Sequence, residues 1–123
     1  MRLRNIPGAK ETIENNRFVV HELQEKRGNW KEVFGNSNPI HIEVGMGKGR
    51  FLMEMADLNP EINYLGIEMY DSVLLRAVQK MEEKAEEGTA PENLRFIRMD
   101  ARELPLIFDK NEIDRIKSGA KRS

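Results

Sequence analysis

The stretch Ile40–Phe51, which reads IHIEVGMGKGRF, decides the fold of this 123-residue chain. An alternating apolar segment runs into the acid Glu43, and glycines follow at positions 45, 47 and 49. A second apolar periodicity begins directly after them. A strand, a glycine loop and a helix in this order form a nucleotide cradle. Glycine lets the backbone turn tightly and lets a ligand come close, and the start of the helix offers free N–H groups.

The spacing of the glycines excludes two common nucleotide-binding loops. A dinucleotide fingerprint that begins at Gly45 requires a glycine at position 50, where the chain has Arg50. A phosphate-binding loop that ends at Lys48 requires glycine at position 42 and Ser or Thr at position 49. The chain has Ile42 and Gly49 there, so neither a dinucleotide nor a triphosphate is the expected ligand.

Three successive predicted strands each stop at a carboxylate. The first strand runs into Glu43, a second apolar strand over residues 62–67 ends on Glu68, and a third over residues 94–99 ends on Asp100. The carboxyl ends of parallel strands lie side by side at the ligand crevice, and an acid at the end of the second strand can accept from both ribose hydroxyls. We therefore expect the three acids to meet at one edge of the sheet.

Helical periodicity separates these strands. Residues 49–58 and residues 71–87 carry apolar side chains at a period of 3.6, and Asp71 or Ser72 is expected to cap the second helix. A shorter helix is expected over residues 30–34. Strands that alternate with helices favour βαβ units and a parallel sheet.

The pattern Glu43-x-Gly45-x-Gly47-x-Gly49 resembles the first motif of the class I S-adenosylmethionine-dependent methyltransferases. Longer segments narrow the resemblance: from residue 1 to about Ile116, the chain is similar to the bacterial tRNA (guanine-N7-)-methyltransferases. Three segments carry this likeness: Met1–Arg4, Asn38–Gly49 and Asn59–Glu68. The resemblance implies an α/β, Rossmann-like fold. It also implies methyl transfer from S-adenosylmethionine to N7 of a guanine in the variable loop of tRNA.

The resemblance also implies a cofactor site at six positions: Glu43, Gly45, Gly47, Glu68, Asp100 and Ala101. The first three would hold the methionine part of S-adenosylmethionine, and Glu68 would take the ribose hydroxyls. Asp100 would accept from the adenine amino group, with the Ala101 N–H near the ring. In the family the N-terminal arm takes part in tRNA contact, which points to Arg2 and Arg4. No catalytic residue is assigned.

The chain departs from the family after Ile116. Relatives continue through a complete fourth strand into an Asn-x-x-Asp-Pro-Trp-Pro-Lys motif, whereas this chain ends in the polar segment 117–123. The expectation is the N-terminal half of the fold, with a parallel sheet in the order 3-2-1 and a stub of strand 4. Residues 1–29 would form a polar basic arm, residues 30–116 a partial S-adenosylmethionine-binding domain, and residues 117–123 a tail outside the family pattern.

This truncated organisation has consequences for the expected activity. The first strand would be an exposed edge through which a second copy could pair, and methyl transfer would be impaired. Two alternatives remain open. The first is a class I methyltransferase fragment with another substrate, and the second is a non-catalytic S-adenosylmethionine-binding fragment or interaction module.

The composition of the chain limits which compartment and which partners are expected for the protein. There is no cysteine, which fits a reducing cytoplasm, and His21 and His41 have no further ligand at metal-binding spacing, so no metal is expected. No apolar run approaches the ~20 residues of a membrane span, so no membrane partner is expected. The formal net charge is −1, so affinity for tRNA must come from local basic clusters.

Overall fold

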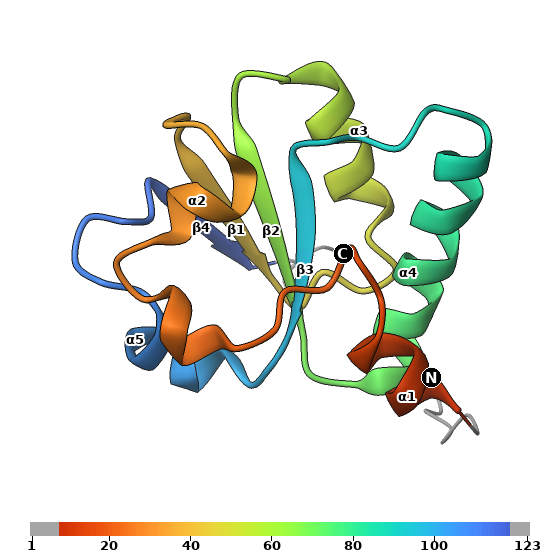
Figure 1. Ribbon diagram of the computed structural model, residues 1–123, viewed down its shortest axis with the longest axis horizontal. Coiled ribbons are helices and arrows are strands. Elements are labelled where there is room, and N and C mark those ends of the chain that lie inside the picture. Colours follow the sequence, from red (N-terminus) through yellow and green to blue (C-terminus); the bar gives the residue numbers. More distant parts are fainter. Residues whose placement is uncertain (1–7, 119–123) are drawn as a thin grey trace.

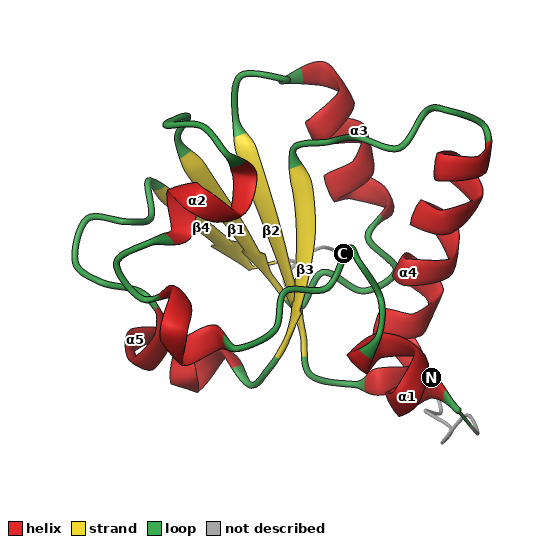
Figure 2. Cartoon of the chain, in the orientation of Figure 1, coloured by secondary structure: helices red, strands yellow, loops and turns green. Residues whose placement is uncertain are grey.

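The computed structural model describes residues 8–118. Its four strands form one parallel sheet in the order β3-β2-β1-β4, with the strands visible side by side in Figures 1 and 2. The strands are β1 (Ile40–Val44), β2 (Asn63–Glu68), β3 (Leu94–Arg98) and β4 (Arg115–Ser118). The predicted α/β class, the parallel order 3-2-1 and the fourth-strand stub are confirmed.

Helices cover both faces of this sheet (Figure 1). On one face lie α3 (Arg50–Leu58) and α4 (Asp71–Glu86), and on the other lie the short helices α2 (Trp30–Phe34) and α5 (Leu104–Ile107). Every residue of β2 is buried, as expected for a central parallel strand with covered faces.

Side-chain alternation divides the core into two clusters. Tyr64 of β2 and Phe96 of β3 pack against α3 and α4, whereas Leu65 and Ile67 of β2 pack with Trp30 on the α2 side. Apolar burial on both faces is the main driving force for this architecture.

The second predicted helix begins where expected, but its cap differs. Tyr70 occupies the N-cap position of α4 and its side chain makes no capping hydrogen bond. The expected cap at Asp71 or Ser72 is wrong, because Asp71 is already the first helical residue and its carboxylate pairs with Arg98 at the end of β3. This ion pair joins the start of α4 to the third strand.

The N-terminal segment differs from the expected polar arm, because residues 8–29 belong to the packed domain. Helix α1 (Ala9–Glu14) lies against α4, with Ile13 in the same core cluster as the α4 side chains. Val20 N donates to Phe96 O and Phe96 N donates to Phe18 O, both at 2.8 Å. The segment around Val19 therefore covers part of the outer edge of β3. Arg2 and Arg4 lie outside the described residues.

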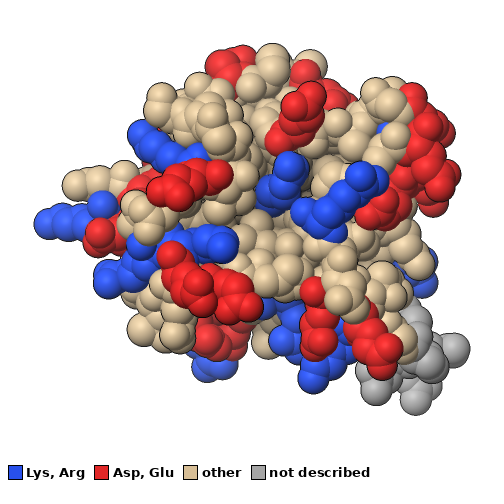
Figure 3. Space-filling model, in the orientation of Figure 1, with Lys and Arg blue, Asp and Glu red and all other residues tan. Residues whose placement is uncertain are grey.

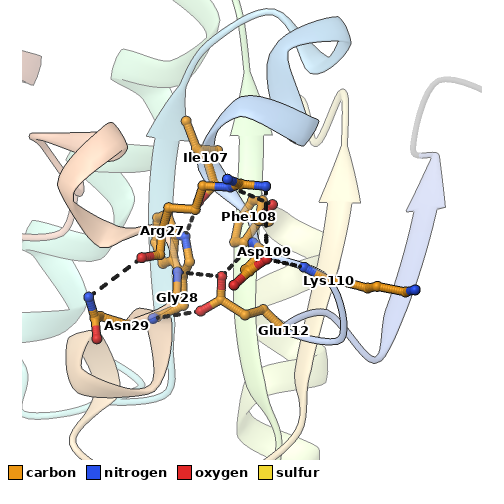
Figure 4. Close-up of polar contacts among 9 residues, drawn as sticks. Arg27, Gly28, Asn29, Ile107, Phe108, Asp109, Lys110 and Glu112 are labelled. Atoms are coloured by element: carbon orange, nitrogen blue, oxygen red, sulfur yellow. Dashed lines mark hydrogen bonds and ion pairs between the residues drawn. The ribbon is translucent and has the colours of Figure 1, made fainter.

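A carboxylate fastens the chain before α2 to the loop after α5 (Figure 4). Glu112 Oε1 accepts from Gly28 N at 2.8 Å and from Asp109 N at 2.7 Å, while Oε2 accepts from Trp30 N at 3.1 Å. Trp30 is fully buried, and its Nε1 donates to Ile107 O at 2.7 Å. These bonds hold residues 28–30 in the domain.

Strand β4 corrects the expectation that β1 would be an exposed edge. Asp114 N donates to Ile40 O at 2.9 Å, and the register places Lys117 opposite Glu43 and Ser118 opposite Val44. The strand thus continues past the expected boundary at residue 116. All four of its residues are exposed, so it lacks the hydrophobic alternation that marks a strand in a sequence.

Within residues 8–118, no helix has the length and apolar character needed to cross a membrane.

Candidate functional site

The three predicted acids belong to the same edge of the sheet. Glu68 is the last residue of β2, Glu43 is the penultimate residue of β1, and Asp100 follows the end of β3 by two residues. Glu43 lies opposite Gly66 in the parallel register. By strand alternation, Glu43 and Glu68 share the face of the sheet that carries Tyr64 and is covered by α3 and α4.

The glycine loop turns back over the end of β2. Gly45 N and Met46 N both donate to Ile67 O, at 2.9 and 3.2 Å. Gly47 N donates to Glu68 Oε1 at 3.1 Å. Gly45 and Gly47 have φ values of +67° and +64°, a left-handed conformation that residues with a Cβ rarely adopt. The glycines therefore allow the turn that brings the loop onto the acid.

Glu68 is held by backbone donors on both of its oxygens. Its Oε2 accepts from Tyr70 N at 3.3 Å, in addition to the bond from Gly47, and the residue is 6% exposed. An ionised carboxylate offers about four acceptor sites, so two remain for a ligand.

Glu43 lies deeper than Glu68. It is 2% exposed and lines a small cavity of about 90 Å³ with Phe51 of α3 and Lys117 of β4. Lys117 Nζ lies 4.4 Å from the centre of the Phe51 ring, a distance at which an aromatic face attracts a cation. Glu43 is therefore almost fully buried, on the wall of this small cavity.

Asp100 caps the 3₁₀ turn Ala101–Glu103. Its Oδ1 accepts from Arg102 N at 2.9 Å, and its Oδ2 lies 2.6 Å from the Arg102 guanidinium. These hydrogen bonds lower the pKa of Asp100 to about 2 from its ordinary value of 3.8, so the side chain is ionised at neutral pH. Met99 N donates to Glu68 O at 3.3 Å, which joins the ends of β2 and β3.

A hollow of about 670 Å³ opens beside Asp100. One wall consists of Met69, Arg98 and Met99, from the ends of β2 and β3, and the opposite wall consists of residues 19–24. The structure thus brings Glu68 together with the loop and places Asp100 on the hollow. Glu43 lines a separate, smaller cavity.

The N-terminal wall of the hollow was missed by the sequence analysis. His21 lines it, and the buried His21 Nε2 has no hydrogen-bond partner within the described part of the chain. The segment has no strand or helix periodicity, and its packing depends on contacts with β3 more than 70 residues away. A lone histidine in such a segment gives no local signal. No group of three or more His, Asp or Glu side chains within residues 8–118 could hold a metal ion.

Comparison with known proteins agrees with this geometry. A family model described as "Putative methyltransferase" matches residues 37–118, from just before β1 to the end of β4. The chain belongs to this methyltransferase family.

Curated relatives of this methyltransferase-family chain carry a specific name. A tRNA (guanine-N(7)-)-methyltransferase of Lachnoclostridium phytofermentans is 58% identical over 116 residues, which cover 94% of this chain and 52% of the relative. The protein of the same name from Bacillus cytotoxicus is 52% identical over 117 residues, with the same coverage. The chain thus spans about half the length of the curated relatives it matches.

Solved structures confirm the predicted Rossmann-like methyltransferase fold. An antibiotic-related methyltransferase superposes with a TM-score of 0.61 at 27% identity, over 74% of this chain and 45% of that one. The aminoglycoside resistance methyltransferase NpmB1 gives 0.53 at 28% identity, over 64% and 38%. A phosphoethanolamine N-methyltransferase of Haemonchus contortus, solved with S-adenosyl-L-methionine, gives 0.52 at 19% identity, over 89% and 24%, and supports the fold alone.

Proposed function

We propose that this chain binds S-adenosylmethionine at the carboxyl edge of β1, β2 and β3. We further propose that it supplies the cofactor-binding part of a tRNA (guanine-N7-)-methyltransferase. The observation that carries the proposal is the hydrogen bond from Gly47 N to the Glu68 carboxylate. It brings a loop of glycines with positive φ next to an acid at the end of the second strand, and these are the two elements that contact a nucleoside in folds of this kind. The names of the curated relatives supply the tRNA substrate.

The chemistry of the edge fits the ligand. S-adenosylmethionine is positively charged at its sulfur and its amino group, so it suits a carboxylate-lined edge better than a phosphate-binding one. The two free acceptor sites of Glu68 match the two ribose hydroxyls. Asp100 is ionised and lies on the hollow beside the 3₁₀ turn, where it would accept from the adenine amino group near the Ala101 N–H.

The methionine end would lie over Gly45 and Gly47, with Glu43 beneath. Glu43 is 2% exposed and Glu68 is 6% exposed, so direct contact with a ligand requires the glycine loop to move outward. Residues 45–49 contain three glycines with positive φ, so this backbone changes conformation at little steric cost. We propose that cofactor entry displaces this loop.

Methyl transfer to guanine N7 depends more on the alignment of the base with the methyl donor than on proton transfer. When bound, the cofactor supplies an electrophilic methyl group on sulfur. Guanine N7 already carries an in-plane lone pair, so no strong general base is needed to activate it. The described residues would hold the methyl donor in a fixed orientation toward the incoming base. A tRNA substrate implies action in the cytoplasm, and that location remains part of the proposal.

Two assays test this function. Titration calorimetry with S-adenosylmethionine should show binding, and Glu68→Gln should weaken it. Transfer of a tritiated methyl group to guanine N7 of unmodified tRNA tests the second part of the proposal. Binding without transfer favours a non-catalytic S-adenosylmethionine-binding module, whereas incorporation at guanine N7 supports the enzyme. The absence of binding contradicts both.

We also propose that the outer edge of β4 pairs with a second copy of the chain. Within residues 8–118 this edge has no neighbouring strand, and Ile116 on it is 59% exposed. Unpaired edge strands offer a row of free N–H and C=O groups to another chain. Light scattering after size-exclusion should show a dimer, and a monomer at every concentration would contradict this part of the proposal.

A further inference from the structure

A groove of about 210 Å³ lies between α3 and α4. Five basic side chains line it: Lys48, Arg50, Arg76, Lys80 and Lys84. Two acids, Glu54 and Asp57, line it as well, which leaves an excess of positive charge in a chain whose net charge is −1. The chain therefore carries a local basic surface although its net charge is slightly negative.

The cations of this α3–α4 groove are not held in ion pairs within the described part of the chain. None of the five makes an ion pair with a carboxylate there, although Arg17, Arg98 and Arg102 elsewhere each do. Arg76 and Lys80 are exposed to solvent. On the face of the molecule shown in Figure 3, by contrast, basic and acidic side chains are interspersed. Unpaired, solvent-facing cations gathered in one groove are available to an anionic partner.

The basic side chains of the α3–α4 groove lie in a row. Arg76, Lys80 and Lys84 recur at every fourth residue of α4 and so lie on one face of the helix, over a length of about 12 Å. Lys48 in the glycine loop and Arg50 at the start of α3 extend the basic surface to the carboxyl edge of the sheet. The row therefore runs from the proposed cofactor site along the α3–α4 seam, where the two helices lie side by side (Figure 1).

A linear array of this kind fits a polyanionic backbone. Arginine binds phosphate oxygens in a bidentate manner, and lysine binds them as a point charge. Met53 is the one apolar side chain that lines the groove and it is 3% exposed, so no large apolar side chain protrudes there for insertion into a lipid bilayer. These properties favour nucleic-acid phosphates over an anionic membrane.

We propose that the α3–α4 groove binds the phosphate backbone of the tRNA substrate and leads the RNA to the methyl donor. The inference rests on the proposed function and adds an RNA-binding surface outside the N-terminal arm. Each phosphate contact releases counterions, so the affinity must fall as the salt concentration rises.

Binding of labelled unmodified tRNA, followed by fluorescence anisotropy at several salt concentrations, tests the proposal. The groove variant is Arg76→Gln/Lys80→Gln/Lys84→Gln. Its matched control, Lys26→Gln/Lys31→Gln/Lys110→Gln, removes the same charge from outside the groove. The slope of log K against log salt should become shallower by about two to three in the groove variant, with affinity lower by on the order of tenfold. The control should keep the wild-type slope.

Further measurements separate this proposal from loss of folding and from the proposed function. Arg76→Lys/Lys80→Arg/Lys84→Arg, which keeps the charges, should keep the affinity for tRNA. Equal slopes for groove variant and control would overturn the proposal, as would no tRNA binding by the wild type. The proposal would also be overturned if the groove variant lost cosedimentation with anionic vesicles but kept its binding to tRNA.

Calorimetry with S-adenosylmethionine should give the same affinity for the wild type and the groove variant. Failure of cofactor binding alone would overturn the proposed function and leave the groove intact.

Discussion

Gly47 N donates a hydrogen bond of 3.1 Å to Glu68 Oε1, so the middle glycine of the loop is joined directly to the last residue of β2. The two residues are 21 positions apart in the chain, and the parallel pairing of β1 with β2 brings them together. Loop conformation and carboxylate position are therefore coupled, and changes at either residue should affect the same ligand.

Gly47→Ala should weaken cofactor binding by altering the loop. The φ of Gly47 is +64°, where an alanine costs about 1–2 kcal/mol, although no atom lies within 4 Å of the added Cβ. Gly35→Ala is the matched control, because Gly35 has a φ of +74° and equally open surroundings at the end of α2. Both variants should lose similar stability in urea, but only Gly47→Ala should lose affinity in calorimetry. Equal affinities for the two variants would argue against a role for the loop.

Glu68→Gln should reduce the affinity for S-adenosylmethionine by roughly tenfold or more, because hydrogen bonds to a charged acceptor contribute about 1.5–3 kcal/mol. The glutamine oxygen can still accept from Gly47 N, so the loop should keep its position. Glu61→Gln removes an exposed acid from the turn before β2 and should leave the affinity unchanged. A Glu68→Gln protein with wild-type affinity would remove this residue from the site.

Glu112→Gln should destabilise the domain by about 1–3 kcal/mol, because one amide oxygen replaces two carboxylate oxygens that accept from three backbone N–H groups. The amide NH₂ would also face a backbone donor. Urea unfolding at 25 °C measures the loss, and Glu86→Gln at the exposed end of α4 serves as the control. An unchanged midpoint would show that residues 28–30 are not held by this carboxylate.

The ion pair of Asp100 with Arg102 predicts a pH dependence. The pKa of Asp100 is lowered to about 2, first of all by the hydrogen bond from the Arg102 side chain. A lowered pKa means that the ionised carboxylate stabilises the fold fully above its ordinary value of 3.8, and that this contribution is lost as the pH falls toward 2. Arg102→Gln should move the pKa upward, toward 3.8.

The carboxyl carbon resonance of Asp100, followed by NMR between pH 6 and pH 3, checks this prediction. The wild-type signal should remain that of the ionised form over most of the range, whereas the Arg102→Gln signal should titrate within it. Identical curves would show that Arg102 does not set this pKa.

The central part of the fold was predictable because its signals are local. Hydrophobic periodicity and turn residues mark the glycine loop, the strand ends at Glu43 and Glu68, and the helices that follow them. In the structure these elements begin and end within one or two residues of the expected limits. The order β3-β2-β1 was expected from the resemblance to the class I methyltransferases, and it is compatible with right-handed βαβ connections.

The missed features depend on contacts between distant residues. Val20 bonds to Phe96 and Ile40 bonds to Asp114, and neither pairing leaves a periodic pattern in the sequence. The N-terminal wall of the hollow and the extension of β4 could not be predicted for this reason. The α3–α4 groove was likewise hidden, because its cations come from two helices and a loop that only the fold brings together. The roles of Glu43, Gly45, Gly47, Glu68, Asp100 and Ala101 in cofactor binding remain predictions.

The most direct measurement is an amide NMR titration of the isotope-labelled chain with S-adenosylmethionine. The largest shifts should lie in the glycine loop, at Met69 after β2 and at Ala101 after β3. Residues of α2 and of the loop around Glu112 should not move. Shifts confined to those distant residues, or no shifts across residues 8–118 at saturating cofactor, would contradict a cofactor site at the carboxyl edge of this sheet.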